Sequence, residues 1–384
     1  MIITMNKTRT RFAPSPTGYM HIGNLRTALF EFLIAKHEGG DFLLRIEDTD
    51  QERKVEGAVD VIYKTLKECG LNWDEGPDIG GDFGPYVQSE RLPMYKGYAE
   101  DLIKLGGAHY CFCSEEEIEA QRKEAESLGI SFKFNDPCKH LSAEEVQAKL
   151  DAGEPYVIRQ TIKNVGETYF DDEVYGRIEV DGDVLDEQIL IKSDGFPTYN
   201  FANIIDDHQM QISHVVRGNE YLSSTPKYNL IYDAYGWERP TYVHVPPVMK
   251  DEHHKLSKRN GDASFQDLVA KGYLPDAIMN YIALLGWAPE TEQEIYTLDE
   301  LIKVFNIHRI SKSPAIFDID KLTWMNGVYL RNMDEETYYE TVRPYLEKAV
   351  HGPYNLKEIA KIIQPRIDIL NQIEESVDFF DTLV

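Results

Sequence analysis

Two short stretches, far apart in the chain, carry residue types suited to binding a polyphosphate. In the first, Pro14–Asn24, His21 and Gly23 stand where a strand-like segment gives way to helical spacing. Backbone N–H groups and the helix dipole attract phosphates at such a junction. In the second, KLSKR, the lysines Lys255 and Lys258 lie three residues apart and can both reach a triphosphate. The ordinary alternatives are a proline-stiffened loop and a solvated basic loop.

Three of the four cysteines gather in one region beside a histidine. Cys111 and Cys113 form C-x-C, and Cys138 and His140 form C-x-H after a gap of 24 residues. Four thiolate and imidazole ligands suffice for a closed tetrahedral zinc site, whose role is structural because no position is left for water. A cluster of free thiols without metal is the alternative. Cys69 lies on the apolar face of a helical segment and is expected in the core.

The elements that must position these motifs alternate between strand and helix, first over residues 9–69 and again over residues 213–245. This alternation predicts a parallel α/β sheet built in two halves. Possible capping boxes at Ser114 and Ser142 predict two helices around the cysteines, followed by strand-like segments. From about Leu268 onward the chain is expected to be mostly helical.

Two helix starts are predicted from capping residues. Thr225 is expected as the N-cap of a helix that begins at Pro226 and ends at Gly236. The acidic run Asp48–Asp50 is expected to cap a helix that begins near Gln51.

The charge balance is 40 basic against 66 acidic residues, a formal net charge of −26. This acidity lowers the expectation of nucleic-acid binding but does not exclude a local basic strip. No apolar run approaches the roughly 18 residues of a membrane span. Residues 1–11 lack the apolar centre of a secretory signal. We therefore expect a cytoplasmic protein with no membrane partner.

Taken together, HIGN and KLSKR resemble the HIGH and KMSKS signatures of class I aminoacyl-tRNA synthetases. The runs RFAPSPTG (11–18), LRIEDTD (44–50), SDGFPTY (193–199) and WMNG (324–327) are similar to bacterial-type glutamyl-tRNA synthetases, and the resemblance covers nearly the whole chain. It implies a two-step reaction that requires tRNA from the first step. L-glutamate reacts with ATP to form glutamyl-adenylate and pyrophosphate, and glutamate then passes to the 3′-terminal adenosine of tRNA(Glu).

The resemblance also implies a fold, a Rossmann-type parallel sheet split by a zinc-binding insertion and followed by a mostly α-helical C-terminal part. Residues 1–110 and 196–250 are expected to form the two halves of the catalytic domain. Residues 111–195 are expected to form the acceptor-stem-binding insertion. Residues 251–332 would hold the KLSKR loop and a helical stem-contact domain, and residues 333–384 the start of a truncated α-helical anticodon-binding domain.

Site residues follow from the resemblance position by position. The implied glutamate site comprises Arg11, Ala13, Ser15, Glu47, Tyr199, Asn203 and Arg217. The implied ATP site, which takes Mg²⁺ with ATP, comprises His21, Gly23, Asn24, Glu220, Tyr221, Lys255, Ser257 and Lys258. Of these, His21, Lys255 and Lys258 would stabilise charge on the phosphates. The implied zinc ligands are Cys111, Cys113, Cys138 and His140.

Simple chemistry agrees with the glutamate assignment. A substrate with two carboxylates needs guanidinium groups, which Arg217 and Arg11 provide, and Glu47 suits its ammonium group. Capping of the helix near Gln51 is the alternative for Glu47. The cluster Asp206-Asp207-His208 is open between metal binding, orientation of the tRNA acceptor end, and solvated turn residues.

Several functional alternatives remain open at this stage. A shortened relative that attaches glutamate to a modified tRNA base would share the catalytic core, and a glutaminyl-tRNA synthetase would share the fold. A non-catalytic tRNA- or zinc-binding module is the alternative from another class. The partners expected for the synthetase are tRNA(Glu), ATP and L-glutamate, and a monomer is expected.

Overall fold

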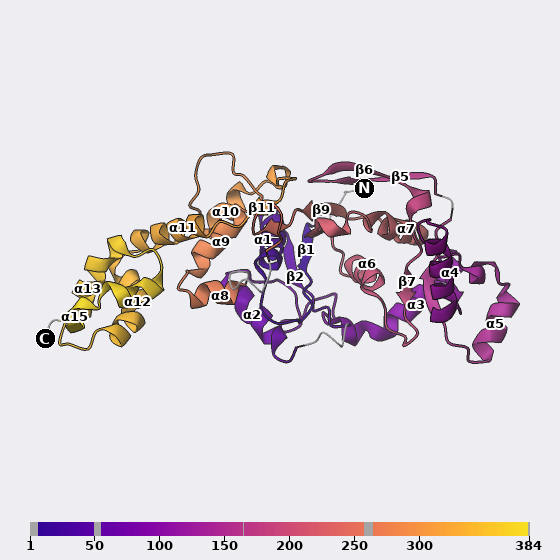
Figure 1. Cartoon of the computed structure of the whole chain (residues 1–384), viewed down its shortest axis with the longest axis horizontal. Coiled ribbons are helices and arrows are strands. Elements are labelled where there is room, and N and C mark those ends of the chain that lie inside the picture. The colour runs from indigo at the N-terminus through magenta and orange to yellow at the C-terminus, as the bar shows by residue number, and fades with distance from the viewer. Residues whose placement is uncertain (1–6, 50–54, 164, 257–263, 383–384) are drawn as a thin grey trace. The chain divides into compact units, whose positions relative to one another are not determined.

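The computed structural model describes residues 7–49, 55–163, 165–256 and 264–382, with the elements labelled in Figure 1. Contacts between Cα atoms divide the chain into two compact units. The first unit comprises Met1–Pro16, Asp41–Lys54 and Trp73–His244, and the second comprises Thr17–Gly40, Val55–Asn72 and Val245–Val384. The five domains predicted from the sequence do not coincide with these units and stay predictions.

The strands of the first unit form three sheets. They are β1 (Arg9–Phe12) with β2 (Asp41–Leu44); β3 (Ala108–Cys111), β4 (Val157–Gln160) and β7 (Ile189–Ile191); and β5 (Glu167–Asp172), β6 (Gly176–Asp181), β8 (His214–Gly218) and β9 (Thr241–Val245). β1 and β2 pair in parallel, as the alternating pattern predicts. The third sheet has the order β6-β5-β9-β8, and β5 pairs with β9 in parallel through Asp172 and Tyr242. The amide of Ser213, just before β8, donates to Arg9 O at 3.0 Å, so β1 lies beside β8.

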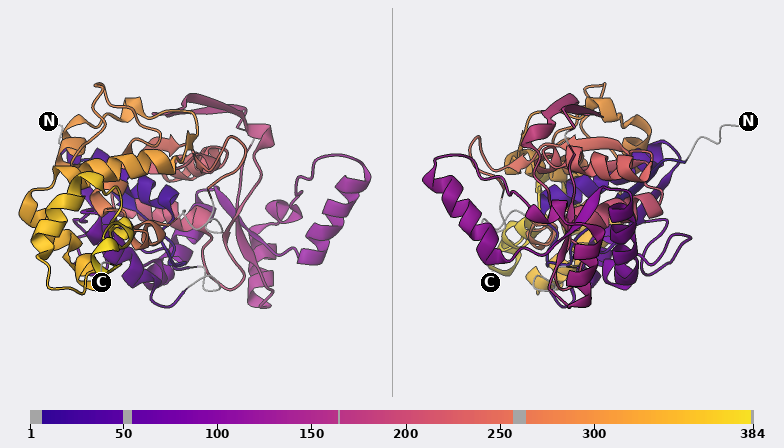
Figure 2. Two further views of the ribbon diagram at one scale, coloured as in Figure 1. Left: turned by 60° about the vertical axis from the view of Figure 1, so that its left-hand side comes forward. Right: turned by 90° about the vertical axis from the view of Figure 1, so that its right-hand side faces the viewer.

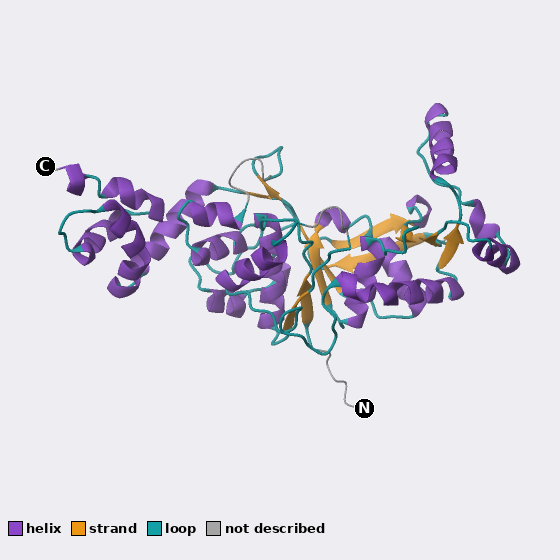
Figure 3. Ribbon diagram, turned by 90° about the horizontal axis from the view of Figure 1, so that it is seen from below, coloured by secondary structure: helices purple, strands orange, loops and turns teal. Residues whose placement is uncertain are grey.

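Helices and short 3₁₀ turns accompany these strands. They are α3 (Leu92–Lys104), α4 (Glu115–Ser127), α5 (Ala143–Asp151), α6 (Tyr199–Gln209) and α7 (Thr225–Tyr235), with η2 (Gln88–Arg91), η3 (Pro137–His140), η4 (Gly182–Val184) and η5 (Asn219–Tyr221). Both predicted capping boxes are confirmed, Ser114 with Glu117 and Ser142 with Glu145. Figure 3 distinguishes the strands (orange) from the helices (purple).

The predicted N-cap of α7 is wrong by one residue. Ser224 is the N-cap, without a side-chain capping bond, and Thr225 is the first helical residue. The Thr225 hydroxyl donates instead to Tyr221 O at 2.8 Å and accepts from Arg217. The end of the helix is confirmed, because Gly236 adopts the left-handed conformation (φ 70°) that terminates helices.

The second unit is mainly helical, as expected. Its helices and strands are α1 (Ile22–His37), α2 (Ala58–Glu68), β10 (Val248–Met249), α8 (Phe265–Ala270), α9 (Pro275–Ala283), α10 (Leu298–Val304), β11 (Ala315–Ile316), α11 (Ile319–Asn332), α12 (Glu335–Ala349), α13 (Leu356–Ile363), α14 (Ile373–Ser376) and α15 (Phe379–Thr382). Figure 2 shows the residues from α8 to the C-terminus, coloured orange to yellow, as mostly helical.

The predicted capping of α2 by the acidic run is wrong for its described residues. α2 begins at Ala58, and its N-cap is Gly57 with φ 76°. Asp48 accepts instead from the backbone and the hydroxyl of Ser89, at 2.9 and 2.8 Å, and Thr49 donates to Gln88. The predicted start at Gln51 lies outside the described residues.

Each unit has an apolar core. In the first unit, α3, α6 and α7 pack against the antiparallel sheet through buried residues such as Tyr95, Ile158, Leu190, Phe201 and Tyr228. A separate core joins α11 to α14 in the second unit. Cys69, which follows α2, is buried at 4% exposure, as predicted for a core residue. No helix within the described ranges is both long and apolar enough to cross a bilayer.

The core formed by α11 to α14 contains a polar group whose burial is unfavourable. The Tyr338 hydroxyl is buried on α12 without a hydrogen-bond partner among the described residues. An unpaired buried hydroxyl costs about 1–3 kcal/mol. We expect Tyr338→Phe to leave this part as stable or more stable, measured by urea unfolding. Tyr281→Phe is the control: its hydroxyl accepts from Asp318 N at 2.6 Å, so its loss should lower the free energy of unfolding.

Candidate active site

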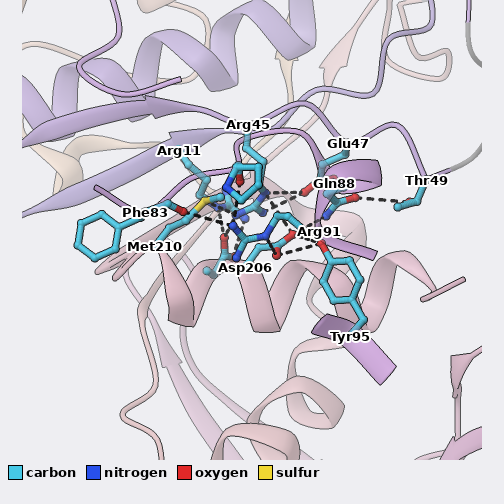
Figure 4. Close-up of polar contacts among 12 residues, drawn as sticks. Arg11, Arg45, Glu47, Thr49, Phe83, Gln88, Arg91, Tyr95, Asp206 and Met210 are labelled. Atoms are coloured by element: carbon cyan, nitrogen blue, oxygen red, sulfur yellow. Dashed lines mark hydrogen bonds and ion pairs between the residues drawn. The ribbon is translucent and has the colours of Figure 1, made fainter. Parts of the chain in front are cut away.

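A buried cluster of three arginines and three carboxylates occupies the first unit near the ends of β1 and β2 (Figure 4). Its members are Arg11, Arg45 and Arg91 with Glu47, Asp206 and Asp207. Alternation along the extended chain after β2 directs Arg45 and Glu47 to one side, where Arg45 Nη2 lies 2.9 Å from Glu47 Oε1. Asp206 and Asp207 lie on α6. Asp207 accepts from Arg11 and Arg45, and Asp206 accepts from Arg91.

Asp207 is paired with two arginines of the cluster. Arg11 donates two hydrogen bonds to it, Nε to Oδ1 at 2.8 Å and Nη2 to Oδ2 at 3.1 Å. Arg45 Nη1 donates a third, to Oδ1 at 2.8 Å. Burial alone would raise the pKa of Asp207, but the charges of Arg11 and Arg45 outweigh it and hold this pKa below its ordinary value. Asp207 is therefore ionised at neutral pH.

Asp206 is paired with a different set of groups. Arg91 Nε donates to it at 2.7 Å, Gln88 Nε2 at 2.9 Å and the Tyr95 hydroxyl at 2.8 Å. These contacts join α6 to α3 and to the turn η2 that precedes it. All are buried, so Asp206 fixes the position of the helix that begins with Tyr199.

The predictions for Asp206-Asp207-His208 are corrected by these contacts. Both aspartates are buried ion-pair acceptors on a helix, not solvated turn residues, and they belong to no metal-binding group found among the described residues. His208 stacks on Trp237 with ring centroids 3.6 Å apart. The sequence does not reveal this outcome because the arginines that pair with the aspartates are more than 100 positions away in the chain.

Three of the residues predicted to bind glutamate, Arg11, Glu47 and Arg217, lie near a fourth, Tyr199, at the start of α6. Burial raises the pKa of the Tyr199 phenol; the negative charge of Glu47 adds to this effect, and Arg217 and Arg11 oppose it. The Tyr199 ring also lies 5.4 Å from the ring of Tyr221, measured between centroids. The structure thus brings Arg11, Glu47, Tyr199 and Arg217 into one neighbourhood, together with Tyr221.

Arg217 differs from the other arginines of this neighbourhood. It is 7% exposed, and no carboxylate among the described residues lies within ion-pair distance of it. Its Nε donates to His244 Nε2 at 3.1 Å and its Nη2 to Thr225 Oγ1 at 2.8 Å. A buried cation without a counter-charge is costly, so this guanidinium is suited to an anionic ligand.

The remaining predicted glutamate residues differ in exposure. Asn203 is buried on α6, and its Nδ2 makes no hydrogen bond within the described part of the chain. Ala13 is half-buried and Ser15 is exposed. Glu47, in contrast, is already bonded to Arg45, and its backbone N–H donates to Pro14 O at 3.0 Å. Burial raises the pKa of Glu47, and Arg45 and Arg11 oppose this rise.

In the second unit the two signature stretches touch each other. His21 is the N-cap of α1, and its Nδ1 accepts from Gly23 N at 3.0 Å. In the neutral ring Nε2 therefore carries the proton and donates to Leu256 O at 3.1 Å. Met20 O also accepts from Phe265 N at 3.0 Å. A Cβ at Gly23 would come within 3.2 Å of His21 Nδ1, so glycine suits this close approach.

The other predicted ATP residues are placed as follows. Lys255 is exposed and forms a bridge with Met249, at the base of a turn in which Lys250 N donates to His254 O at 2.8 Å. Asn24 is exposed on α1. Glu220 and Tyr221 form part of η5 in the first unit. Ser257 and Lys258 lie outside the described residues.

The predicted zinc ligands are brought together in part. The sulfur atoms of Cys111, Cys113 and Cys138 and a carboxylate oxygen of Asp136 all lie within 4.8 Å of one another. Helix α4 lies between the two predicted ligand pairs, Cys111 with Cys113 and Cys138 with His140, as predicted. His140 is exposed at the end of η3 and is not in this group. The sequence pattern did not predict Asp136, which is the N-cap of η3 and accepts from Cys138 N at 2.9 Å.

The geometry of this group fits a tetrahedral ion. At a Zn–S distance near 2.3 Å, two sulfur ligands of a tetrahedral ion lie about 3.8 Å apart. Cys113 Sγ and Cys138 Sγ are 3.7 Å apart. Burial alone would raise the pKa of Asp136, but hydrogen bonds from His109, Cys111 and Cys138 hold it below its ordinary value. The fourth member of the group is therefore a carboxylate at neutral pH.

The cluster around Asp207 makes a stability prediction. We expect Asp207→Asn to lower the free energy of unfolding by about 3 kcal/mol at pH 7, because it leaves buried arginine charge uncompensated. The pKa of Asp207 is lowered, so its contribution is complete above about pH 4 and is lost as the pH falls through the folded value. Urea unfolding between pH 3 and 7 should show a weaker acid dependence in the variant.

The matched control is Asp233→Asn. Asp233 pairs with Arg239 at the surface, where an ion pair contributes about 0–1 kcal/mol. Equal losses of stability in the two variants would contradict the importance assigned to Asp207.

Comparison with known proteins identifies the family. A family model for the class I tRNA synthetases (E and Q), catalytic domain, matches residues 7–324. The glutamate–tRNA ligase of Clostridium tetani (strain Massachusetts / E88) is 60% identical over 378 residues, which cover 98% of this chain and 78% of that protein. The glutamate–tRNA ligase of Clostridium acetobutylicum is 59% identical over 379 residues, with coverage of 98% and 78%.

A solved structure agrees with these relatives. The crystal structure of a glutamate tRNA ligase from Elizabethkingia meningosepticum CCUG26117, in complex with its amino acid, matches with a TM-score of 0.92 and 37% sequence identity, covering 98% of this chain and 80% of that chain. A similar structure from Elizabethkingia anophelis gives a TM-score of 0.91. The two signatures, the α/β sheets and these relatives lead to one conclusion: the chain belongs to the class I tRNA synthetases of the glutamate and glutamine type.

Proposed function

We propose that this chain is a glutamate–tRNA ligase, which activates L-glutamate with ATP and transfers it to the 3′-terminal adenosine of tRNA(Glu). The observation that carries the proposal is Arg217, a buried guanidinium without a carboxylate partner among the described residues. It shares a neighbourhood with the carboxylate of Glu47 and the phenol of Tyr199. An amino acid with a side-chain carboxylate and an ammonium group complements this arrangement.

Two arginines of the proposed amino-acid site have different roles. Arg217 is available for a substrate carboxylate, whereas Arg11 is held by two bonds to Asp207. Arg11 therefore acts mainly by orienting α6, and its contact with glutamate is a smaller part of its role. Glu47 keeps one oxygen on Arg45 and offers the other to the substrate ammonium.

The ATP site is proposed to form from His21, Gly23 and Asn24 with the KLSKR run, including Ser257 and Lys258. The Leu256 carbonyl that accepts from His21 ties the two runs together, which supports the proposal. The α-carboxylate of glutamate attacks the α-phosphate of ATP, and pyrophosphate leaves. Fixed donors stabilise the charge that develops on the phosphate oxygens. A Mg²⁺ ion bound with ATP supplies further positive charge.

Helices α8 to α13 favour the full ligase over a shortened relative that modifies a tRNA base. The names of the relatives, glutamate–tRNA ligases at about 60% identity, support the same choice. Transfer of glutamate to the terminal adenosine of tRNA(Glu), with no transfer to a modified base of another tRNA, is the activity that separates these two alternatives.

Lys258 provides the direct test of the ATP assignment. We expect Lys258→Ala to lower the rate of ATP–pyrophosphate exchange, measured with glutamate and tRNA present, by about 10²–10³-fold. The reason is the loss of one preorganised donor to the phosphates, while the KM for glutamate stays close to that of the wild type.

Lys104→Ala, which removes an exposed lysine of α3 that pairs with Asp101, is the matched control and should exchange at the wild-type rate. Exchange by Lys258→Ala at the control rate would defeat the ATP assignment. A wild-type chain that attaches no glutamate to tRNA(Glu) would defeat the proposed function as a whole.

We propose that the cysteine group of the first unit holds one structural zinc ion. Three thiolates and one further ligand make a closed site, so its role is to fix β3 against η3 and α4. The sequence pattern predicts His140 as the fourth ligand, whereas Asp136 is the residue whose carboxylate lies within 4.8 Å of the three sulfur atoms, which supports it as an alternative fourth ligand. Burial raises the pKa of Cys111 to about 11, and a divalent cation would favour the thiolate over this protonated form.

Metal analysis tests the zinc proposal and the fourth ligand together. We expect about one zinc per chain by mass spectrometry of the purified protein, and we expect its loss in Cys138→Ser. Asp136→Asn and His140→Asn should differ: the variant that lacks the true fourth ligand releases zinc to a chelator faster. A wild-type chain that binds no zinc and is unaffected by chelator would show a free-thiol cluster instead.

A further inference from the structure

A buried chain of hydrogen bonds lies behind Arg217 and is not part of the predicted glutamate site. It runs from Asp172 on β5 to His244 on β9 and from there to Arg217 on β8. Asp172 Oδ2 and His244 Nδ1 are 2.6 Å apart, and His244 Nε2 and Arg217 Nε are 3.1 Å apart. All three side chains are buried, and His244 is 0% exposed.

The bond to Arg217 fixes the protonation state of His244. A guanidinium nitrogen only donates, so His244 Nε2 must accept and carries no proton. The single proton of the neutral imidazole is then on Nδ1, where it donates to Asp172. Burial lowers the pKa of His244, and the charge of Arg217 lowers it further against the opposing effect of Asp172. The ring is therefore a neutral acceptor that faces a cation.

Asp172 is itself held in place by the backbone. Its Oδ1 accepts from the amides of Val174 and Tyr175, at 3.0 and 2.8 Å. Its Oδ2 also accepts from the amide of His244 at 3.1 Å. These three amides belong to β9 and to the turn after β5, so the carboxylate cannot rotate without losing several bonds. It gives the imidazole one orientation and one tautomer.

Thr225 completes the support on the other side of the guanidinium. Its hydroxyl donates to Tyr221 O at 2.8 Å, so the oxygen lone pair is directed to Arg217 Nη2 at 2.8 Å. Nε and Nη2 of Arg217 are thus engaged by neutral acceptors. Nη1 has no hydrogen-bond partner among the described residues. The guanidinium lies over the rings of Tyr221, Tyr228 and Tyr242 at 5.2, 4.8 and 5.5 Å, but no carboxylate among the described residues neutralises it, so its charge is left for a ligand.

We propose that Asp172 and His244 are positioning residues that orient Arg217 for the side-chain carboxylate of the amino acid and so set the preference for glutamate over glutamine. This inference rests on the proposed function. A carboxylate at the place of His244 would neutralise Arg217 and remove its advantage for an anionic substrate. A neutral acceptor orients the guanidinium and leaves its charge intact, which favours a carboxylate over a carboxamide.

The most informative variant is Asp172→Asn, which preserves shape. The asparagine amide can donate to His244 Nδ1 and so favours the tautomer with the proton on Nε2, where it opposes the Arg217 Nε–H. We expect the KM for glutamate to rise at least about tenfold, with the KM for ATP unchanged, in ATP–pyrophosphate exchange with tRNA present. We also expect the ratio of kcat/KM for glutamate to that for glutamine to fall.

The matched control is Asp171→Asn, which changes the preceding, exposed residue of the same strand. It should retain the wild-type KM for glutamate and the wild-type discrimination. Thermal unfolding of both variants shows whether Asp172→Asn is folded. If it does not fold, two substitutions of His244 test the inference in its place.

His244→Gln and His244→Ala separate positioning from simple packing. The glutamine oxygen can take the place of Nε2 and accept from Arg217, whereas alanine offers no acceptor. We expect His244→Ala to raise the KM for glutamate more than His244→Gln does, with the KM for ATP equal in both.

Two outcomes would overturn the inference while the proposed function stands. One is an active wild type with Asp172→Asn folded and indistinguishable from Asp171→Asn in its KM for glutamate. The other is an equal rise of the KM for glutamate and for ATP in both His244 variants, which indicates general disruption. A wild type that activates no glutamate would instead overturn the proposed function itself.

Discussion

The buried pairing of Asp207 with Arg11 and Arg45 is the interaction on which the amino-acid site depends. One carboxylate on α6 holds an arginine of β1 and an arginine that follows β2, so a helix and two parallel strands share a single electrostatic centre. Each guanidinium would be costly to bury alone, and the cluster stabilises all of them only as a set. Because α6 begins with Tyr199 and carries Asn203, the same centre also places two proposed contacts of the substrate.

The arginines near this centre fall into two kinds. Arg11, Arg45 and Arg91 are neutralised by carboxylates of the protein, whereas Arg217 is bonded to a neutral imidazole and a hydroxyl. This difference gives the proposed site one buried cation that is suited to meet an anion in an otherwise compensated environment. A strongly acidic chain can therefore bind anionic ligands, because local charge and not net charge decides binding.

The cysteine group is also assembled from segments that are far apart in the chain. β3 and the residues after it provide two thiols, and η3 provides the third, with Asp136 as its N-cap. Asp136 also accepts from His109 at 2.9 Å and lies beside Arg159, so the group is joined to the sheet behind it. The C-x-C and C-x-H spacing predicts in outline where a group of possible metal ligands forms, but it does not determine which side chain completes the donor set.

The sequence by itself determined the family, the order of the main elements and the candidates for the site. Local rules sufficed for β1, α1, both capping boxes and the left-handed Gly236, because each depends on residues a few positions apart. The paired signatures pointed to His21 and Lys255, although Ser257 and Lys258 lie outside the described residues. Local rules failed at Thr225 and at Asp48, where a side chain expected to cap a helix makes other bonds. Thr225 is bonded to Tyr221 O and Arg217, and Asp48 is bonded to Ser89, 41 positions away.

Only the tertiary structure decided what the charged and polar side chains do. The sequence left Asp206 and Asp207 open between metal binding, orientation of the tRNA acceptor end and a solvated turn. In the fold they are buried acceptors, because three arginines from separate segments converge on them. Asp172 and His244 belong to no recognised motif. The role proposed for them, orienting Arg217, becomes visible only because β5 and β9 pair and bring them behind Arg217. The physical reason is that burial makes an unpaired charge costly, and which charges are buried together is fixed by packing and not by spacing along the chain.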